Sequence, residues 1–306
     1  MTRMKHSALI IAFFSFSLLA LASIGWAAER TVQGTDAAKR HNLARRGSTQ
    51  HDSTGNQTLP VQLRSQVALV VDQDTDEVLL QKNSHTVAPI ASITKLMTAL
   101  VTLEADLPLD EELVVTHEDR TSDRVRSVLQ PGVRLTRAQA LQLALMASEN
   151  QAAQLLARTY PGGVTAFVSA MNAKAHLLGM AQTRFVEPTG LSPENRSSPQ
   201  DLVRLVKAAA EHRLIREYST AESITLSVGN RTIRYQNTNR LVASPAWQIG
   251  LQKTGYIAAA GRCLVMQALI QGRRVVMILL DSAGKYSRLA DAQRIRAWIE
   301  SSGKRA

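Results

Sequence analysis

The sequence has 306 residues, 45% of them hydrophobic, which suffices for one large domain or two closely packed ones and excludes a disordered chain. Lysine and arginine number 36 against 25 aspartates and glutamates, and the formal net charge of +11 favours anionic surroundings such as membrane head groups or envelope polymers. Nucleic acid is a poor candidate partner, because only five phenylalanines and five tyrosines are present and basic and aromatic residues do not alternate.

The amino terminus has the pattern of a secretory signal peptide. Two positive charges precede an apolar run over 8–22, and small residues follow up to Ala28. Cleavage after Ala27 or Ala28 would remove residues 1–27 and release the protein into the periplasm. The alternative is an uncleaved anchor, because the apolar run is close to the length that spans a bilayer. The small residues at its end favour cleavage, and we expect at most a loose membrane association through the basic surface.

A polar segment separates this signal from the first expected strands. Residues 28–60 are mixed in charge and show no apolar period, so we expect a flexible leader there. The ordered domain is expected over 61–302. It begins with two apolar runs, 66–71 and 78–80, on either side of the turn-prone segment 72–76. This pattern predicts a β-hairpin.

Helices are expected to dominate the middle of the chain. An apolar helix should enter through Pro89 and run to about Leu103. Apolar residues at helical spacing then predict an all-helical insertion over about 104–220, with a polar break at 148–150. The helices expected within it are 136–146, 150–157, 164–178 and 198–212.

Strands return after this insertion. The expected strands are 224–228, 232–235, 249–255, 263–270 and 274–280, and a last helix is expected over about 287–301. The order predicts an α+β fold in which one mixed, mostly antiparallel sheet is flanked by helices and interrupted by the helical insertion. The only cysteine, Cys263, cannot form an internal disulfide and is expected to be a small buried side chain in its strand.

Ser92 and Lys95 lie three residues apart at the start of the first expected helix. Residues at this spacing share one helical face, so the amine would lie beside the hydroxyl. A lysine that is desolvated or crowded by another cation can be neutral enough to activate a serine. The spacing alone fits equally a serine at the helix N-cap with a solvated lysine one turn later.

Two further polar groups lie at element ends. Ser148, Glu149 and Asn150 interrupt a pair of helices, so the hydroxyl and the amide can point out of a loop. Lys253, Thr254 and Gly255 end an apolar strand, where a glycine lets a ligand backbone approach the strand edge. Taken alone, they are equally a helix-capping serine and a strand end with a solvated lysine.

Together, Ser-x-x-Lys, Ser-x-Asn and Lys-Thr-Gly form the set found in class A β-lactamases and penicillin-binding proteins. From about 67 to 299 the chain resembles the low-molecular-mass penicillin-binding proteins, which are serine D-alanyl-D-alanine peptidases, and among them the periplasmic D-alanyl-D-alanine endopeptidases. The matching segments are 144–150, 184–191 and 259–266. The resemblance implies a β-lactamase/transpeptidase-like fold, a substrate in the peptide cross-links of peptidoglycan, β-lactam antibiotics as covalent inhibitors, and no cofactor.

The resemblance also implies roles in acyl transfer. Ser92 would attack the carbonyl of a D-alanyl peptide bond, Lys95 would accept its proton, and water would later release the acyl group. Ser148 would pass a proton toward the departing amine. Lysine as a base requires a lowered pKa, and like-charge repulsion from Lys253 is a candidate cause.

The remaining motif residues would bind the substrate. Asn150 would orient the base and the substrate amide, and Lys253 would supply positive charge. Thr254, followed by Gly255, would hold a substrate carboxylate or carbonyl. Backbone N–H groups of Ser92 and Tyr256 would form the oxyanion hole.

Three other functions stay open. A class A β-lactamase deacylates through a glutamate-held water, and Glu187 superficially fits that role, but Leu191 stands where its loop would require asparagine, so Glu187 is interpreted as structural. D,D-carboxypeptidases often continue into a β-rich domain and an amphipathic anchor, whereas this chain stops after its last expected helix, which favours the endopeptidase. A non-catalytic wall-binding module could have the same fold, but it would not need to keep all three motifs, so their presence favours an enzyme.

Metal chemistry has no support in the sequence, because none of the seven histidines lies in a His-Glu-x-x-His arrangement.

Overall fold

A five-stranded sheet forms the centre of the protein, with strand order β2-β1-β11-β10-β9. The computed structural model describes residues 59–121, 127–228 and 231–302, so the expected signal peptide and almost all of the expected leader lie outside the described residues. Every neighbouring pair in this sheet is antiparallel, so the sheet is not the mixed one that we expected. Short turns join β1 to β2, β9 to β10 and β10 to β11, and antiparallel pairing allows such connections. The strands are β1 (Ser65–Asp72), β2 (Val78–Lys82), β9 (Gln248–Ile257), β10 (Gly261–Ile270) and β11 (Arg273–Ser282).

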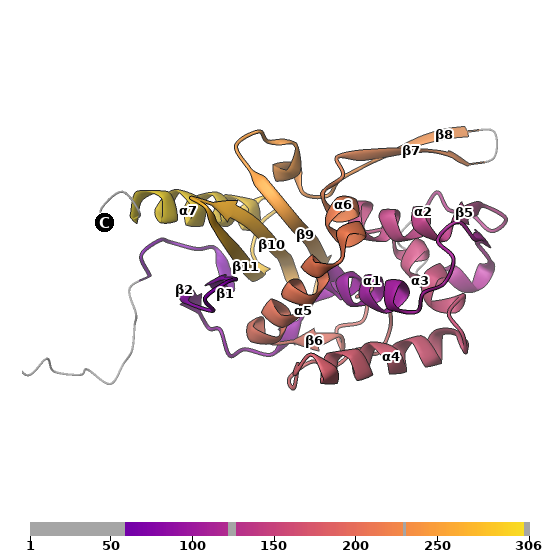
Figure 1. Ribbon diagram of the computed structural model, residues 1–306, viewed down its shortest axis with the longest axis horizontal. Coiled ribbons are helices and arrows are strands. Elements are labelled where there is room, and N and C mark those ends of the chain that lie inside the picture. The colour runs from indigo at the N-terminus through magenta and orange to yellow at the C-terminus, as the bar shows by residue number, and fades with distance from the viewer. Residues whose placement is uncertain (1–58, 122–126, 229–230, 303–306) are drawn as a thin grey trace, which may run out of the picture. The chain divides into compact units, whose positions relative to one another are not determined.

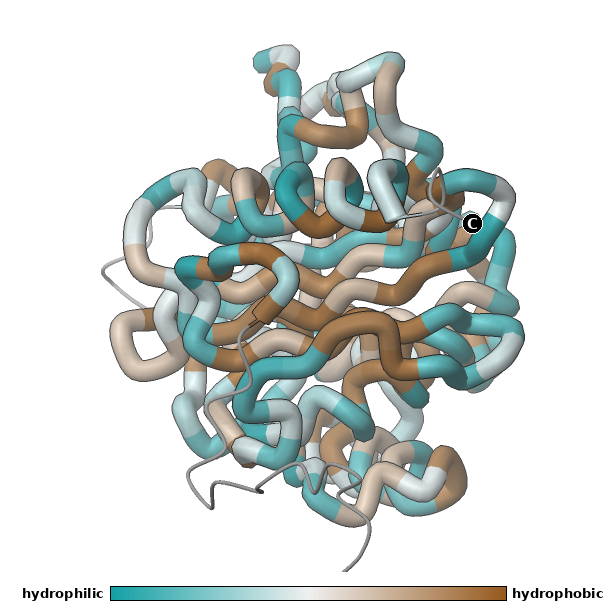
Figure 2. Tube along the Cα trace, turned by 90° about the vertical axis from the view of Figure 1, so that its left-hand side faces the viewer, coloured by the Kyte–Doolittle hydropathy of each residue, from teal (hydrophilic) through white to brown (hydrophobic). Residues whose placement is uncertain are grey.

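Both faces of this sheet are buried. Leu69 and Val71 of β1 face a core shared with α1 (Lys95–Glu104) and α5 (Pro199–Glu211), while Val70 faces a second core under α7 (Ser287–Ser302). Figure 2 shows the hydrophobic segments gathered along the middle of the strands. Burial on both faces explains why the strands read as continuous apolar runs rather than as alternating patterns.

The expected helices are present, with differences at the site and near the end of the insertion. Ser92 lies on a 3-10 turn, η1, and α1 begins only at Lys95. The sequence does not predict α6, which is short and mostly polar and packs on β9. The helical elements not yet given are η1 (Ala91–Thr94), η2 (His117–Asp119), α2 (Arg137–Gln142), a π-helical turn η3 (Leu143–Ala147), α3 (Asn150–Arg158), α4 (Gly163–Leu177), α6 (Arg213–Thr220) and η4 (Arg240–Ala243).

Six short strands lie outside the central sheet. The late hairpin β7–β8 pairs only with itself and projects away from the central sheet in Figure 1, whereas we expected it within one sheet. The pairs β3–β6 and β4–β5 escape the sequence analysis because strands of two or three residues have no measurable period. These strands are β3 (Ala88–Pro89), β4 (Glu112–Val114), β5 (Arg134–Thr136), β6 (Arg196–Ser197), β7 (Ser223–Val228) and β8 (Arg231–Gln236).

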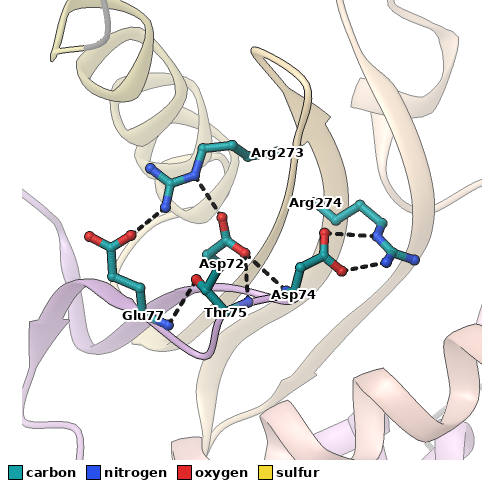
Figure 3. Close-up of polar contacts among 6 residues, drawn as sticks. All are labelled: Asp72, Asp74, Thr75, Glu77, Arg273 and Arg274. Carbon is teal, nitrogen blue, oxygen red and sulfur yellow. Dashed lines mark hydrogen bonds and ion pairs between the residues drawn. The ribbon is translucent and has the colours of Figure 1, made fainter. Parts of the chain in front are cut away.

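A polar cluster fixes the β1–β2 turn to the start of β11 (Figure 3). Asp72 accepts backbone N–H bonds from Asp74 at 2.9 Å and Thr75 at 3.1 Å, which closes the expected turn. Its other oxygen accepts from Arg273 Nε at 2.6 Å, and Arg274 pairs with Asp74. Each carboxylate of this group has a cationic partner, so the acidic run 72–77 is structural.

Cys263 is fully buried, as expected. Burial raises the pKa of its thiol to about 11, so the thiol is not a nucleophile at neutral pH. Within the described ranges, no helix is long and apolar enough to cross a bilayer, and no three His, Cys, Asp or Glu side chains are arranged to hold a metal ion.

The carboxylate of Asp291 joins α7 to the start of β1. It is fully buried and accepts bonds from Arg64 N at 3.0 Å, Ser65 N at 2.7 Å and Ser65 Oγ at 2.6 Å, and Arg294 on the next turn pairs with it. Asp291 thus satisfies the first donors of the sheet where the chain enters the domain.

We expect Asp291→Ala to lower the free energy of unfolding by roughly 3 kcal/mol, because it leaves two buried donors of Ser65 and the part-buried N–H of Arg64 without an acceptor. Urea denaturation measures the change. Glu300→Ala on the same helix removes only a half-exposed pair with Arg296 and should cost less than about 1 kcal/mol. Equal losses in the two variants would contradict the structural role of Asp291.

Candidate active site

Ser92 and Lys95 are brought together by the tight turn that precedes α1. In a 3-10 turn residues three apart are eclipsed, so the Lys95 side chain returns directly to the Ser92 hydroxyl. The distance from Lys95 Nζ to Ser92 Oγ is 3.1 Å. Ala91, just before the serine, adopts a left-handed backbone with φ of 48°, a strained conformation that often accompanies functional sites.

The Lys95 amine is completely buried and has three neighbours, all oxygen atoms. Besides Ser92 Oγ, they are Asn150 Oδ1 at 2.7 Å and the Thr189 carbonyl at 2.6 Å. The last two can only accept, so they occupy the two N–H bonds of a neutral amine. The lone pair of that amine then points to Ser92, which is the arrangement a general base requires.

The cause of the lowered lysine pKa differs from our expectation. Burial lowers the pKa of Lys95 to about 7, and the carboxylates of Glu187 and Glu149 partly oppose this effect. Burial, rather than the repulsion that we expected from Lys253, is thus the largest cause. Burial, and after it the charges of Lys95 and Arg288, hold the pKa of Lys253 well below its usual range. The sequence could not reveal this, because it does not show how deeply the amines lie.

Ser148 and Lys253 form the second part of the site. Lys253 Nζ donates to Ser148 Oγ at 2.8 Å and to the Thr254 carbonyl at 2.9 Å. Ser148 ends the η3 turn with φ of 61°, a position that ordinarily favours glycine. A serine at this helix end is therefore unusual, because the left-handed backbone would be easier for glycine, which has no side chain.

Asn150 and Thr254 lie on the expected elements, but Thr254 is inside β9, which continues to Ile257, rather than at the end of the strand. Asn150 is the first residue of α3, and its amide oxygen reaches Lys95. The Thr254 hydroxyl lies 2.6 Å from the hydroxyl of Thr238. Tyr256, the next residue but one on β9, has a half-exposed ring that stacks on Arg262 at 4.3 Å.

Two glycines allow the segments of the site to touch. A Cβ on Gly255 would lie 3.0 Å from Ser92 N and 3.0 Å from the Ala91 side chain, and one on Gly190 would lie 1.9 Å from the Ala91 carbonyl oxygen. We expected Gly255 to make room for a ligand, whereas its near neighbour is the chain itself. The contact places the amides of Ser92 and Tyr256 on touching elements.

Glu187 holds its own loop together. Its carboxylate accepts from Thr189 N at 2.7 Å, Gly190 N at 2.6 Å and Asn195 Nδ2 at 2.8 Å. These bonds fix the carbonyl of Thr189, which in turn contacts Lys95. The structural interpretation of Glu187 agrees with this arrangement.

Three residues of the site were not found from the sequence. Thr189 contacts Lys95 through its backbone carbonyl, which any residue type could supply. Thr238 lies in a polar connection between elements, where a threonine does not stand out in the sequence. Arg288 is buried on the first turn of α7, and its Nε has no hydrogen-bond partner among the described residues. Burial, and then Arg262, lower the pKa of Arg288, and the charge of Arg288 in turn lowers the pKa of Lys253.

The chain is similar in sequence to bacterial D-alanyl-D-alanine peptidases. A model of the S11 peptidase family, described as D-alanyl-D-alanine carboxypeptidase, matches residues 53–284. The D-alanyl-D-alanine endopeptidase of Pseudomonas aeruginosa is 49% identical over 247 residues, which are 79% of this chain and 80% of that protein. The enzyme of the same name from Escherichia coli is 46% identical over 242 residues, or 78% of each chain.

The fold has a counterpart among solved structures. The crystal structure of a D-alanyl-D-alanine carboxypeptidase from Mycobacterium tuberculosis matches with a TM-score of 0.72 at 28% sequence identity, over 79% of this chain and 94% of that chain. An antiparallel sheet flanked by helices is therefore the fold that this chain shares with a D,D-peptidase.

Gly190→Ala should lower the free energy of unfolding by roughly 2 to 5 kcal/mol, because the cost of a left-handed backbone is added to the cost of a clash with Ala91. It should also slow the labelling of Ser92 by a fluorescent penicillin, because Ala91 directly precedes Ser92. Gly272→Ala has the same backbone strain but open space around it, so only about 1–2 kcal/mol should be lost and labelling should persist. Urea denaturation and gel fluorescence measure both. Identical behaviour of the two variants would argue against close packing at Ser92.

The rate of penicillin acylation should depend on pH through Lys95. Because its pKa is about 7, protonation at lower pH removes the lone pair, and the rate should fall about tenfold per unit well below pH 7. Glu149→Gln removes a carboxylate that raises the pKa of Lys95, so its midpoint should move to lower pH. Second-order rate constants measured between pH 5 and 8.5 test both statements. A flat profile would rule out Lys95 as the base.

Proposed function

The chain belongs to the S11 family of D-alanyl-D-alanine peptidases, which are hydrolases, and from this premise we propose that it is a serine D,D-endopeptidase that cleaves D-alanyl cross-links of peptidoglycan. The observation that carries the proposal is the buried Lys95 amine 3.1 Å from the Ser92 hydroxyl. Both curated relatives described above are named endopeptidases, which favours cross-links over terminal D-alanine as the substrate.

In the proposed reaction the hydroxyl of Ser92 attacks the carbonyl carbon of a D-alanyl peptide bond. Its proton passes to the neutral amine of Lys95, and an ester forms as the C–N bond breaks. The departing amine takes a proton from Ser148, whose hydroxyl is in contact with Lys253. Ser148 in turn regains the proton that Lys95 took from Ser92, so that both groups return to their starting states. Water then hydrolyses the ester, and Ser92 regains its proton.

The cationic side of the site would bind the carboxylate next to the scissile bond. Burial and the charge of Arg288 lower the pKa of Lys253, and Lys253 has no acidic partner among the described residues, so a substrate carboxylate would supply a counter-charge that favours its protonated form. Thr254 would donate to the same carboxylate. The backbone N–H groups of Ser92 and Tyr256 would bind the oxyanion, where preorganised donors lower the barrier most.

The location of the substrate fits an exported enzyme. Peptidoglycan lies outside the cytoplasmic membrane, and the signal peptide expected over 1–27 would deliver the protein to the periplasm. β-lactam antibiotics would acylate Ser92 and inhibit the enzyme.

The decisive experiment is digestion of purified cross-linked muropeptide dimers beside monomeric pentapeptides. We expect the wild-type protein to convert dimers to monomers, and Ser92→Ala to lose at least about a thousandfold in rate and all labelling by fluorescent penicillin. Ser84→Ala, which removes a buried serine hydroxyl bonded to Gln81, serves as the matched control and should stay active.

Each other outcome points to another function. Release of terminal D-alanine with intact dimers would make the protein a carboxypeptidase. Rapid turnover of penicillin would make it a β-lactamase. Persistent labelling of Ser92→Ala would exclude Ser92 as the nucleophile.

A further inference from the structure

Thr238, on the connection between β8 and η4, joins two segments of the site. Its hydroxyl lies 2.6 Å from that of Thr254. Its backbone N–H donates to the carbonyl of Met146 at 3.2 Å, and its hydroxyl lies 3.4 Å from the same oxygen. Met146 is two residues before Ser148. Thr238 is therefore bonded both to the strand of Thr254 and to the turn that leads to Ser148.

The residues on either side of Thr238 hold this connection in place. Asn237 donates to the Ser219 carbonyl at 2.9 Å, and its amide oxygen accepts from Asn239 N at 2.9 Å and from Gln252 Nε2 at 2.9 Å. Gln252 precedes the Lys-Thr-Gly motif on β9. The hydroxyl of Thr238 is thus fixed in space relative to the strand that it contacts.

We propose that Thr238 is a positioning residue for substrate binding, which directs the hydroxyl proton of Thr254 toward a substrate carboxylate. This inference rests on the proposed role of Thr254. It adds a residue outside the three motifs and predicts that the site distinguishes a free carboxylate from its neutral ester or amide partly through Thr238.

The two hydroxyls share one contact and have two protons, so they have two arrangements. In the first, Thr254 donates to Thr238, and Thr238 donates to the Met146 carbonyl. In the second, Thr238 donates to Thr254, and the Thr254 proton is free for a ligand. In the first arrangement only lone pairs of the Thr254 oxygen face the site, which suits an empty site or a ligand that donates a hydrogen bond. The second arrangement offers a proton and suits an anion.

A carboxylate selects the second arrangement at small cost. The bond given up, from Thr238 to Met146, spans 3.4 Å and is therefore weak, and the Met146 carbonyl keeps its bond from the backbone of Thr238. The bond gained, from Thr254 to a carboxylate, is charge-assisted and is strengthened by the hydroxyl behind it. A neutral ester gains much less from this change.

The test compares acylation of Ser92 by a penicillin and by its methyl ester. In the wild type we expect the free acid to react faster. Thr238→Val keeps the shape of the side chain but removes the hydroxyl, so the advantage of the acid over the ester should fall about tenfold, through a weaker apparent affinity rather than a slower limiting rate. Thr238→Ser should restore the advantage to within about twofold.

Two controls separate positioning from folding. Thr225→Val, at an exposed position of the β7–β8 hairpin that precedes Thr238, should leave both rates unchanged, and melting temperatures establish that each variant is folded. Equal slowing of acid and ester in Thr238→Val would overturn the proposal, as would an unchanged ratio or a failure of Thr238→Ser to restore it. The acid and ester comparison measures acylation alone. If the digestion experiment left muropeptide dimers intact, that result would contradict the endopeptidase assignment but not the proposed role of Thr238.

Discussion

Two lysine amines, Lys95 and Lys253, are fully buried in the site with no acidic partner in direct contact among the residues that the structure describes, and the site depends on this constraint. Moving an ammonium group out of water costs several kcal/mol unless its charge is balanced. Lys95 and Lys253 meet only neutral oxygen atoms. The Lys95 amine in such a place loses its proton easily and can act as a base, whereas a lysine amine in water stays protonated at neutral pH. Removal of water is the largest cause of the lowered pKa that activates Lys95.

The fold supplies these oxygen atoms from segments that are far apart in the chain. One comes from the turn before α1, one from the start of α3, one from the Glu187 loop, and two around Lys253 from η3 and β9. They converge because the sheet is buried on both faces and because Gly190 and Gly255 allow backbones to touch. Strained residues, Ala91 and Ser148, mark the two places where a hydroxyl is turned into the site.

The strands of the central sheet, the long helices and the three motifs could be predicted from the sequence, because apolar runs and residue spacing carry that information. Contacts made by the backbone could not, and the Thr189 carbonyl is the clearest example. Helix α6 is stabilised by packing on β9 rather than by its own pattern. Arg288 did leave a trace, since it shares helical spacing with the buried Ala292 and Ile295, where a charged residue is out of place.

The pairing of β1 with β11 has a consequence for how the molecule forms. These neighbours in the sheet come from opposite ends of the domain, and Asp291 bonds to Arg64 across a sequence separation of 227 residues. The loop between them must close before the central strands can pair, which makes folding slow and dependent on nearly the whole domain. A chain still being synthesised or translocated therefore has no assembled site, and the capacity to react with β-lactams would appear only once the last strand and helix have docked.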